Sequence, residues 1–285
     1  MLWKTCLPMN PLPSLVATDV PPDLDPNVPP GGRFSSQPLD NVERDTYGWQ
    51  IDLDGFGEAG QRRLKGATVL ISRVGGLGGA VAQYLAAAGI GRLILAHAGA
   101  IQPSDLNRQI LMTHAGIGHS RIDSASRRLR DLNPRLEIIA VPENISPANA
   151  DALVAQADVV VDAAPLFTER YAINRAAMAA RRPVVESAVY DLELHLTTIQ
   201  PGTTACLRCL YPEPSTTWQR RFPVLGAVSG FAGTLAALEV VKLITGLSRP
   251  LTHQLLVANL RTMSWRKLRT RRLSDCPDCG HLSTP

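Results

Sequence analysis

Four of the five cysteines form two pairs with the spacing of metal ligands. Cys206 and Cys209 are separated by two residues, as are Cys276 and Cys279. Each pair can chelate from one tight turn, and two such turns supply four thiolates for a tetrahedral Zn²⁺ ion. Because four thiolates leave no open coordination position, we predict a structural zinc site. Disulfides or free thiols are the alternative, but prolines interrupt the N-terminal apolar residues and no secretion signal is recognisable.

A glycine-rich turn follows a short apolar run. Residues Thr68–Ile71 are typical of a buried strand, and the turn Arg73-Val74-Gly75-Gly76-Leu77-Gly78 leads into an alanine-rich helix at 80–88. Such a turn exposes backbone N–H groups to a phosphate. The first glycine of the dinucleotide fingerprint falls at Arg73, so the fingerprint is incomplete. The turn is about equally consistent with a nucleotide site and with a tight turn that serves only packing. His97 ends the next strand, where a dinucleotide fold would have an acidic residue.

Two groups of basic residues offer further chemistry. Arg108 follows the second predicted strand, and an arginine facing the glycine turn could clamp a triphosphate. The alternative is a solvated loop. A later basic run is either an exposed strand face or a docking surface for an acidic protein; it comprises Arg261, Arg266, Lys267, Arg269, Arg271 and Arg272.

The elements that must position these residues alternate between strands and helices. After the strand at 68–71 we expect strands at 93–96, 136–141, 158–161 and 183–186, with helices between them. This order predicts a Rossmann-like, doubly wound, mostly parallel α/β sheet. The alternating residues 192–199 and the runs at 255–260 and 263–273 predict an antiparallel C-terminal extension. A helix is expected at 230–245.

Composition sets limits on the class of protein. The chain has 285 residues, a net charge of +4 and 5% aromatic residues, which argue against a dedicated nucleic-acid binder. Proline-rich residues 1–44 are expected to form a disordered arm, and residues 45–285 a nucleotide-binding domain. The apolar runs 74–91 and 222–238 contain glycines and are borderline in length for crossing a bilayer. We therefore expect a cytoplasmic protein without a membrane partner.

In combination and order, the motifs resemble the ThiF/MoeB/HesA family, the bacterial relatives of the ubiquitin-activating enzymes, over residues 45–280. Gly75–Gly78, the segment 84–91, Ser104–Gln109, the segment 116–121 and both cysteine pairs match family motifs. The segment 222–227 is most similar to the HesA branch.

The resemblance implies a homodimer that binds ATP with Mg²⁺ and the Gly-Gly tail of a small β-grasp carrier protein. The tail carboxylate would attack the α-phosphate and release pyrophosphate. Arg108 and Arg121 would be catalytic. The nucleotide would be bound by Gly75, Gly76, Gly78, Arg108, Gln109 and Arg121.

Several positions depart from the family pattern. The substituted positions are Arg73 for the first glycine, His97 and Gly99 for acids, Asp105 for asparagine, Arg121 for lysine, Pro165 for the metal aspartate and Trp49 for an arginine from the partner subunit. Gln219 or Arg220 stands where the family has a sulfur-handling cysteine. Asp162 or Asp105 could replace the metal ligand, and Arg73 could bind phosphate. Two functions therefore remain open, an adenylyltransferase with altered residues and a dimeric scaffold that has lost catalysis. A dinucleotide-dependent oxidoreductase does not explain the cysteine pairs.

Overall fold

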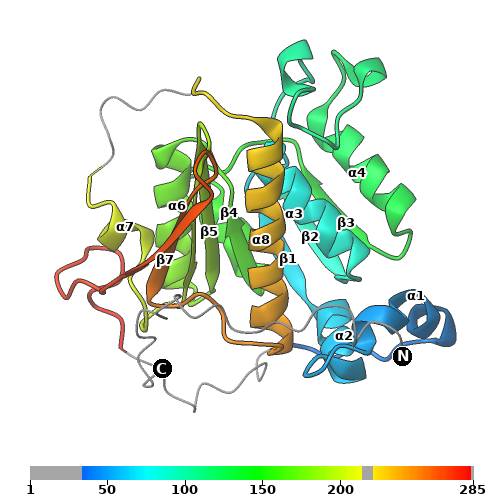
Figure 1. The fold of residues 1–285 in the computed structure, drawn as a ribbon, viewed down its shortest axis with the longest axis horizontal. Coiled ribbons are helices and arrows are strands. Elements are labelled where there is room, and N and C mark those ends of the chain that lie inside the picture. Colours follow the sequence, from blue (N-terminus) through cyan, green and yellow to red (C-terminus); the bar gives the residue numbers. More distant parts are fainter. Residues whose placement is uncertain (1–33, 214–220, 284–285) are drawn as a thin grey trace.

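A computed structural model describes residues 34–213 and 221–283 of the chain (Figure 1). Within these residues, one eight-stranded sheet has the order β3-β2-β1-β4-β5-β6-β7-β8. The strands are β1 (Thr68–Ile71), β2 (Arg92–Ala96), β3 (Glu137–Val141), β4 (Val159–Asp162), β5 (Val184–Tyr190), β6 (Glu193–Ile199), β7 (Gln254–Asn259) and β8 (Ser264–Arg269).

The first five strands pair in parallel, and β5 through β8 pair in antiparallel fashion. Strands β1 and β4 are buried at every position, which explains their continuous apolar sequences in the centre of the sheet. The mostly parallel sheet with an antiparallel C-terminal extension is thus confirmed.

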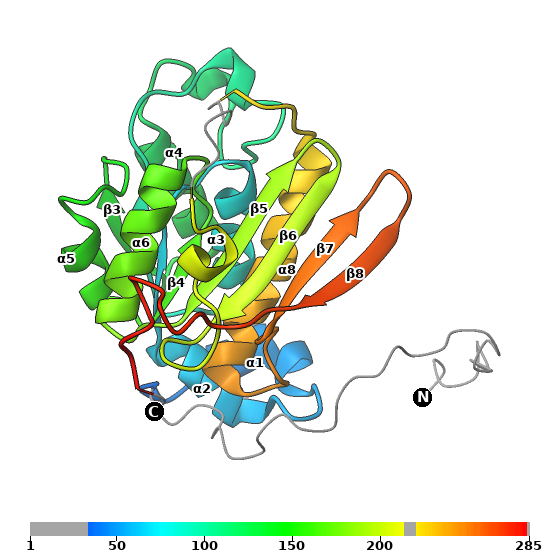
Figure 2. The same cartoon turned by 90° about the vertical axis from the view of Figure 1, so that its left-hand side faces the viewer.

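Helices cover both faces of the sheet. They are α1 (Asn41–Ile51), α2 (Gly57–Gly66), α3 (Gly76–Ala87), α4 (Arg121–Leu132), α5 (Ala150–Ala155), α6 (Phe167–Ala179), α7 (Leu207–Leu210) and α8 (Gly226–Thr245). Apolar side chains of α3, α4 and α8 form one core, and those of α5, α6 and α7 form a second core on the opposite face. Figures 1 and 2 show these two layers on either side of the strands.

Helix α8 begins at Gly226, four residues earlier than the sequence pattern predicts, and ends at Gly246 in the left-handed conformation (φ 74°). Among the described helices it alone is long and apolar enough to span a membrane by length and composition. More than half of its apolar window is buried inside the protein, as in the core helix of a globular domain.

Helix α1 was not expected from the sequence. Asp40 accepts from the Glu43 amide and the Glu43 carboxylate accepts from the Asp40 amide, so a capping box starts the helix. Residues 41–44, which the sequence pattern assigns to the arm, are therefore helical. The remainder of the arm up to residue 33, with Cys6, lies outside the described residues.

Candidate functional site

The sheet has a topological switch point between β1 and β4. From β1 the chain winds outward through β2 to β3, and from β4 it winds the other way to β5. Helix α3 leaves β1 on one face, whereas α6 leaves β4 on the other. Open α/β sheets bind ligands in the crevice at the carboxyl ends of such strands.

The glycine turn lies at this point, between β1 and α3. A Cβ at Gly78 would stand 1.7 Å from the Arg73 carbonyl oxygen, so this glycine is required for the turn itself. A Cβ at Gly76 would come within 3.2 Å of the Arg108 side chain, whereas one at Gly75 would meet nothing closer than Gln109 at 3.9 Å. The turn therefore faces the Arg108–Gln109 segment, as we expected.

Asp105 is the centre of the polar cluster beside the glycine turn. Its Oδ2 accepts from Arg121 Nη2 at 2.7 Å and Nε at 3.0 Å, and its Oδ1 accepts from Gln109 Nε2 at 2.8 Å. The side chains of Asp105 and Arg121 are only 6% and 12% exposed. The charged pair is strong because it is largely shielded from water and hydrogen-bonded through two nitrogens of the guanidinium.

Gln109 and Arg108 have polar atoms that are available to bind a ligand. Gln109 Oε1 is buried and has no hydrogen-bond partner among the described residues. Arg108 is 29% exposed; its Nη1 donates to the Ser104 carbonyl at 2.7 Å and its Nη2 lies 3.8 Å from Asp105. An orphaned acceptor and an accessible guanidinium at the carboxyl ends of parallel strands fit a nucleotide, which offers hydroxyl or amino donors and phosphate oxygens.

Arg73 pairs with an acid that the sequence did not identify. Its Nε donates to Glu169 Oε2 at 2.8 Å, and its Nη2 donates to Glu169 Oε1. The two side chains are 8% and 9% exposed. Arg73 is therefore already bidentately paired in this structure.

A second buried cluster lies where β4, β5 and α6 meet. Arg170 donates from Nε to Asp162 at 3.2 Å and from Nη2 to Glu186. Burial raises the pKa of Asp162, and burial also raises the pKa of Glu186 to about 7. Glu186 Oε2 has no hydrogen-bond partner in the part of the chain that the structure describes.

These ion pairs determine whether Asp105 or Asp162 can bind a magnesium ion. Asp105 is paired with Arg121, and Asp162 is paired with Arg170. A hard cation prefers carboxylate oxygens that are charged and accessible, and an adjacent guanidinium opposes its approach. Neither of the two replacement ligands suggested by the sequence therefore fits Mg²⁺ in this arrangement.

The four cysteines of the two CxxC pairs meet as predicted. All four Sγ atoms lie within 4.8 Å of one another, and the Cys206–Cys276 and Cys209–Cys279 separations are 3.6 and 3.4 Å. Zn–S bonds of about 2.3 Å in a tetrahedron require S–S separations of about 3.8 Å. A hydrogen bond from Cys206 lowers the pKa of Cys209 to about 5. The donor set fits a tetrahedral metal ion, and these are free thiols in the structure.

Two residues that the sequence analysis missed support the cysteine turns. Asn174 on α6 donates to Asp278 at 2.6 Å and accepts from the Leu207 amide at 2.9 Å. Arg272 donates to the carbonyls of Gly202 and Cys279, both at 2.6 Å. Arg272 is one of the residues of the basic run, and its guanidinium binds the backbone of the second cysteine turn rather than facing solvent. Strand β8, by contrast, is exposed at all six positions, as its predicted strand face requires.

Of the other substituted positions, Gly99 adjoins the polar cluster, whereas Trp49 lies apart from it. Trp49 on α1 is 95% exposed, and His97 is buried at the end of β2. Gly99 adopts φ 85°, and a Cβ there would lie 2.8 Å from Arg121 Nη1, so a side chain would disturb Arg121. Gln219 and Arg220 lie outside the described residues.

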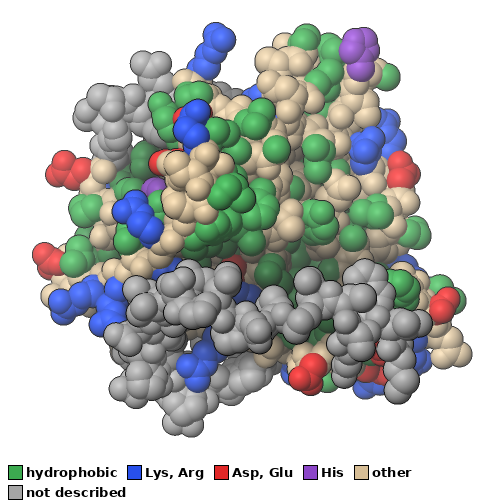
Figure 3. Space-filling model, in the orientation of Figure 1, with side chains coloured by type: hydrophobic (Ala, Val, Ile, Leu, Met, Phe, Trp, Pro, Cys, Tyr) green, Lys and Arg blue, Asp and Glu red, His purple; other side chains and the backbone are tan. Residues whose placement is uncertain are grey.

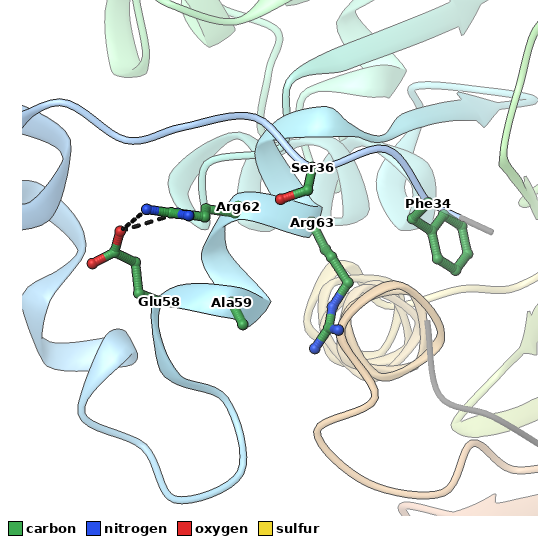
Figure 4. A pocket seen from close by; sticks show the side chains of 6 residues that line it. All are labelled: Phe34, Ser36, Glu58, Ala59, Arg62 and Arg63. Carbon is green, nitrogen blue, oxygen red and sulfur yellow. Dashed lines mark hydrogen bonds and ion pairs between the residues drawn. The ribbon is translucent and has the colours of Figure 1, made fainter. Parts of the chain in front are cut away.

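A hollow of about 540 Å³ opens beside α2 and is lined by Phe34, Ser36 and Arg63 (Figure 4). Arg62 and Glu58 line the same hollow and form an ion pair of 2.7 Å. Since α2 directly precedes β1, this hollow lies at the amino end of that strand, opposite to the glycine turn. It is not where an α/β sheet of this type binds its ligand.

The fold and the cysteine cluster define an α/β protein with a mostly parallel sheet and a four-cysteine centre. A family model for the ThiF family matches residues 47–278, and the chain belongs to this family.

Relatives over most of the chain carry two kinds of name. The protein HesA (vegetative) of Trichormus variabilis is 49% identical over 85% of this chain and 91% of its own. A sulfur carrier protein adenylyltransferase of Thermus thermophilus is 36% identical over 85% of this chain and 93% of its own.

Among solved structures, E. coli MccB with ATP superposes with a TM-score of 0.71 at 25% identity, covering 78% of this chain and 69% of MccB. A complex of MccB with MccA gives a TM-score of 0.72 at 24% identity, with 78% and 70% coverage. These likenesses agree with the fold described above.

Proposed function

We propose that this protein adenylates the C-terminal carboxylate of a small carrier protein. The carboxylate oxygen attacks the α-phosphorus of ATP, forming an acyl-phosphate bond, and the bond to pyrophosphate breaks. The observation that carries the proposal is the convergence of Arg108, Gln109 and Arg121 beside the glycine turn. A relative named as a sulfur carrier protein adenylyltransferase supports this reaction.

In this proposal Gln109 and the turn glycines hold the nucleotide, and Arg108 and Arg121 stabilise negative charge that develops on the phosphates. Arg108 donates to the Ser104 carbonyl and to the neighbouring Asn107 amide oxygen, and its Nη2 lies 3.8 Å from Asp105. Its side chain is 29% exposed, so it can reorient towards a phosphate. Arg121 is held by Asp105 and contributes a fixed charge. The family match at 47–278 lies within the 45–285 body that we propose as the catalytic unit.

We further propose that the four cysteines hold a structural Zn²⁺ ion. The ion would cross-link the turn after β6 to the C-terminal segment, which are 70 residues apart at Cys206 and Cys276. A closed four-thiolate site supplies folding energy and no catalytic position.

A group of exposed apolar side chains on α8 and β8 supports the proposed carrier, and a homodimer, as protein partners. Phe231 on α8 and Trp265 on β8 make an edge contact with centroids 5.8 Å apart, yet are 39% and 43% exposed. Leu238 and Leu268 are exposed to a similar degree. Figure 3 shows hydrophobic side chains gathered on this face of the molecule. Contiguous apolar patches of this kind mark protein interfaces.

ATP–pyrophosphate exchange tests the proposal. The purified protein should exchange labelled pyrophosphate into ATP only when a carrier ending in Gly-Gly is present, and Arg108→Ala should abolish the exchange. Arg175→Ala is the control, because Arg175 is also a solvent-accessible arginine but pairs with Asp151 in the opposite layer, away from the glycine turn. Exchange that stays at background with several carriers would contradict the proposal.

A specific observation favours the second candidate, a scaffold without catalysis. Asp105, Asp162 and Arg73 are each engaged by an oppositely charged neighbour, so the substituted residues form internal pairs. A protein that binds the carrier in a pull-down or by calorimetry, without pyrophosphate exchange, would be this scaffold.

A further inference from the structure

The connections that leave β1 and β4 lie directly against each other. Ser72 N donates to the Val161 carbonyl at 3.1 Å, and Ser72 Oγ accepts from the Ala163 amide at 2.9 Å. One connection continues into α3 and the other into α6, on opposite faces of the sheet. The space above these two connections is the switch-point crevice in which the fold class holds a nucleotide.

The Arg73–Glu169 pair joins these two connections across the switch point. Arg73 belongs to the connection after β1, and Glu169 to the first turn of α6 after β4. Both side chains are more than nine-tenths buried. Separating two buried charges leaves each without compensation and is strongly unfavourable, unless another group takes the place of one partner.

A phosphate meets the requirement for such a replacement. Its oxygens accept from a guanidinium in the same two-pronged geometry as a carboxylate. The neighbouring start of α3 at Gly76 has backbone amides that favour an anion. Glu169 thus occupies the position on Arg73 that a phosphate group suits.

We propose that the Arg73–Glu169 pair closes the crevice in the free protein, and that a nucleotide phosphate enters by replacing Glu169 on Arg73. This inference rests on the nucleotide binding of the proposed function, and it adds a closing contact and a phosphate-binding residue. The apparent affinity for ATP is lowered because only the open fraction of the protein is competent to bind.

The test is a calorimetric titration of the purified full chain with ATP and with pyrophosphate. Glu169→Gln removes the competing charge and keeps the size of the side chain, so we expect it to bind both ligands about tenfold more tightly than the wild type. The control is Glu58→Gln, whose partners Arg44 on α1 and Arg62 on α2 are 41% and 43% exposed. Its affinity should equal that of the wild type. In the double variant with Arg73→Gln, the gain should disappear.

Equal affinities of the wild type and Glu169→Gln would overturn the closing contact. A double variant as tight as Glu169→Gln would overturn the assignment of Arg73 as the phosphate partner. Glu169→Asp, which keeps the charge but shortens the side chain by one methylene, provides a second variant if Glu169→Gln does not fold. It should bind ATP with an affinity between those of the wild type and Glu169→Gln, and an unchanged affinity would count against the proposal.

The titration needs no carrier protein, so its outcome is separate from that of the exchange assay. Tighter ATP binding by Glu169→Gln without any exchange supports the closing contact and contradicts adenylation. Exchange by the wild type together with an unchanged ATP affinity in Glu169→Gln supports adenylation and contradicts the closing contact. Absence of ATP binding in all variants contradicts both.

Discussion

Asn174 Nδ2 lies 2.6 Å from the Asp278 carboxylate, so α6 is tied directly to the second cysteine turn. Asn174 also reaches the first turn, where its Oδ1 accepts from the Leu207 amide and its Nδ2 lies 3.6 Å from Cys206 Sγ. One amide that is 98% buried therefore positions both turns. The neighbouring Arg170 lies one helical turn earlier and pairs with Asp162 at the end of β4 and with Glu186 within β5, so α6 joins the cysteine centre to the sheet.

Replacing Asn174 should weaken metal binding by the cysteines. We expect the wild type to carry about one zinc ion per chain, and Asn174→Ala to release it to a chromogenic chelator about 10- to 100-fold faster, the usual effect of losing a residue that orients metal ligands. Asn41→Ala is the control, because Asn41 makes its side-chain contact with Arg44 at the surface of α1. Equal release rates for the wild type and Asn174→Ala would show that the asparagine does not position the ligands.

Asp105 and Arg121 should behave as a coupled pair. Asp105→Asn leaves a guanidinium that is only 12% exposed without its carboxylate, so we expect a loss of about 3 kcal/mol in the free energy of unfolding. Adding Arg121→Lys, which restores the residue pair of the family pattern, should recover part of this loss because an ammonium on a flexible stem can reach water. Urea denaturation of the four proteins in the cycle measures the coupling. Strictly additive single effects would contradict it.

Glu186 should make stability depend on pH. Burial raises its pKa from 4.5 to about 7, so between these values the folded protein keeps a proton that the unfolded chain releases. The stabilisation of the folded state by this retained proton is fully present below pH 4.5. It is lost as pH rises through 7, which lowers the free energy of unfolding by on the order of 3 kcal/mol. Glu186→Gln cannot ionise, so its unfolding free energy should rise relative to the wild type between pH 5 and 8. Urea unfolding at four pH values tests this, and parallel profiles would refute it.

The features that could be predicted from the sequence are those that depend on patterns within a few neighbouring residues. The order of strands follows from apolar runs and intervening helices, and the cysteine centre from two CxxC spacings, because both signals lie within a few residues. Glu169 and Arg170 could not be predicted as buried partners, since charges on a helix usually face solvent and their partners are distant in sequence. Helix α1 was missed although Asp40 and Glu43 carry a capping-box spacing, because proline-rich sequence precedes them.

Gly78 should be the least replaceable glycine of the turn. In a helix interior, alanine is normally more stable than glycine by about 0.5–1 kcal/mol. At Gly78, however, a methyl group would stand 1.7 Å from the Arg73 carbonyl oxygen, which is backbone and cannot rotate away. We expect Gly78→Ala to lose about 3 kcal/mol or more of unfolding free energy. Gly75→Ala is the matched control, because its nearest neighbour would be Gln109 at 3.9 Å, an ordinary contact distance. Denaturant midpoints that are equal for the two variants would contradict the close approach of β1 and α3 on which the site is built.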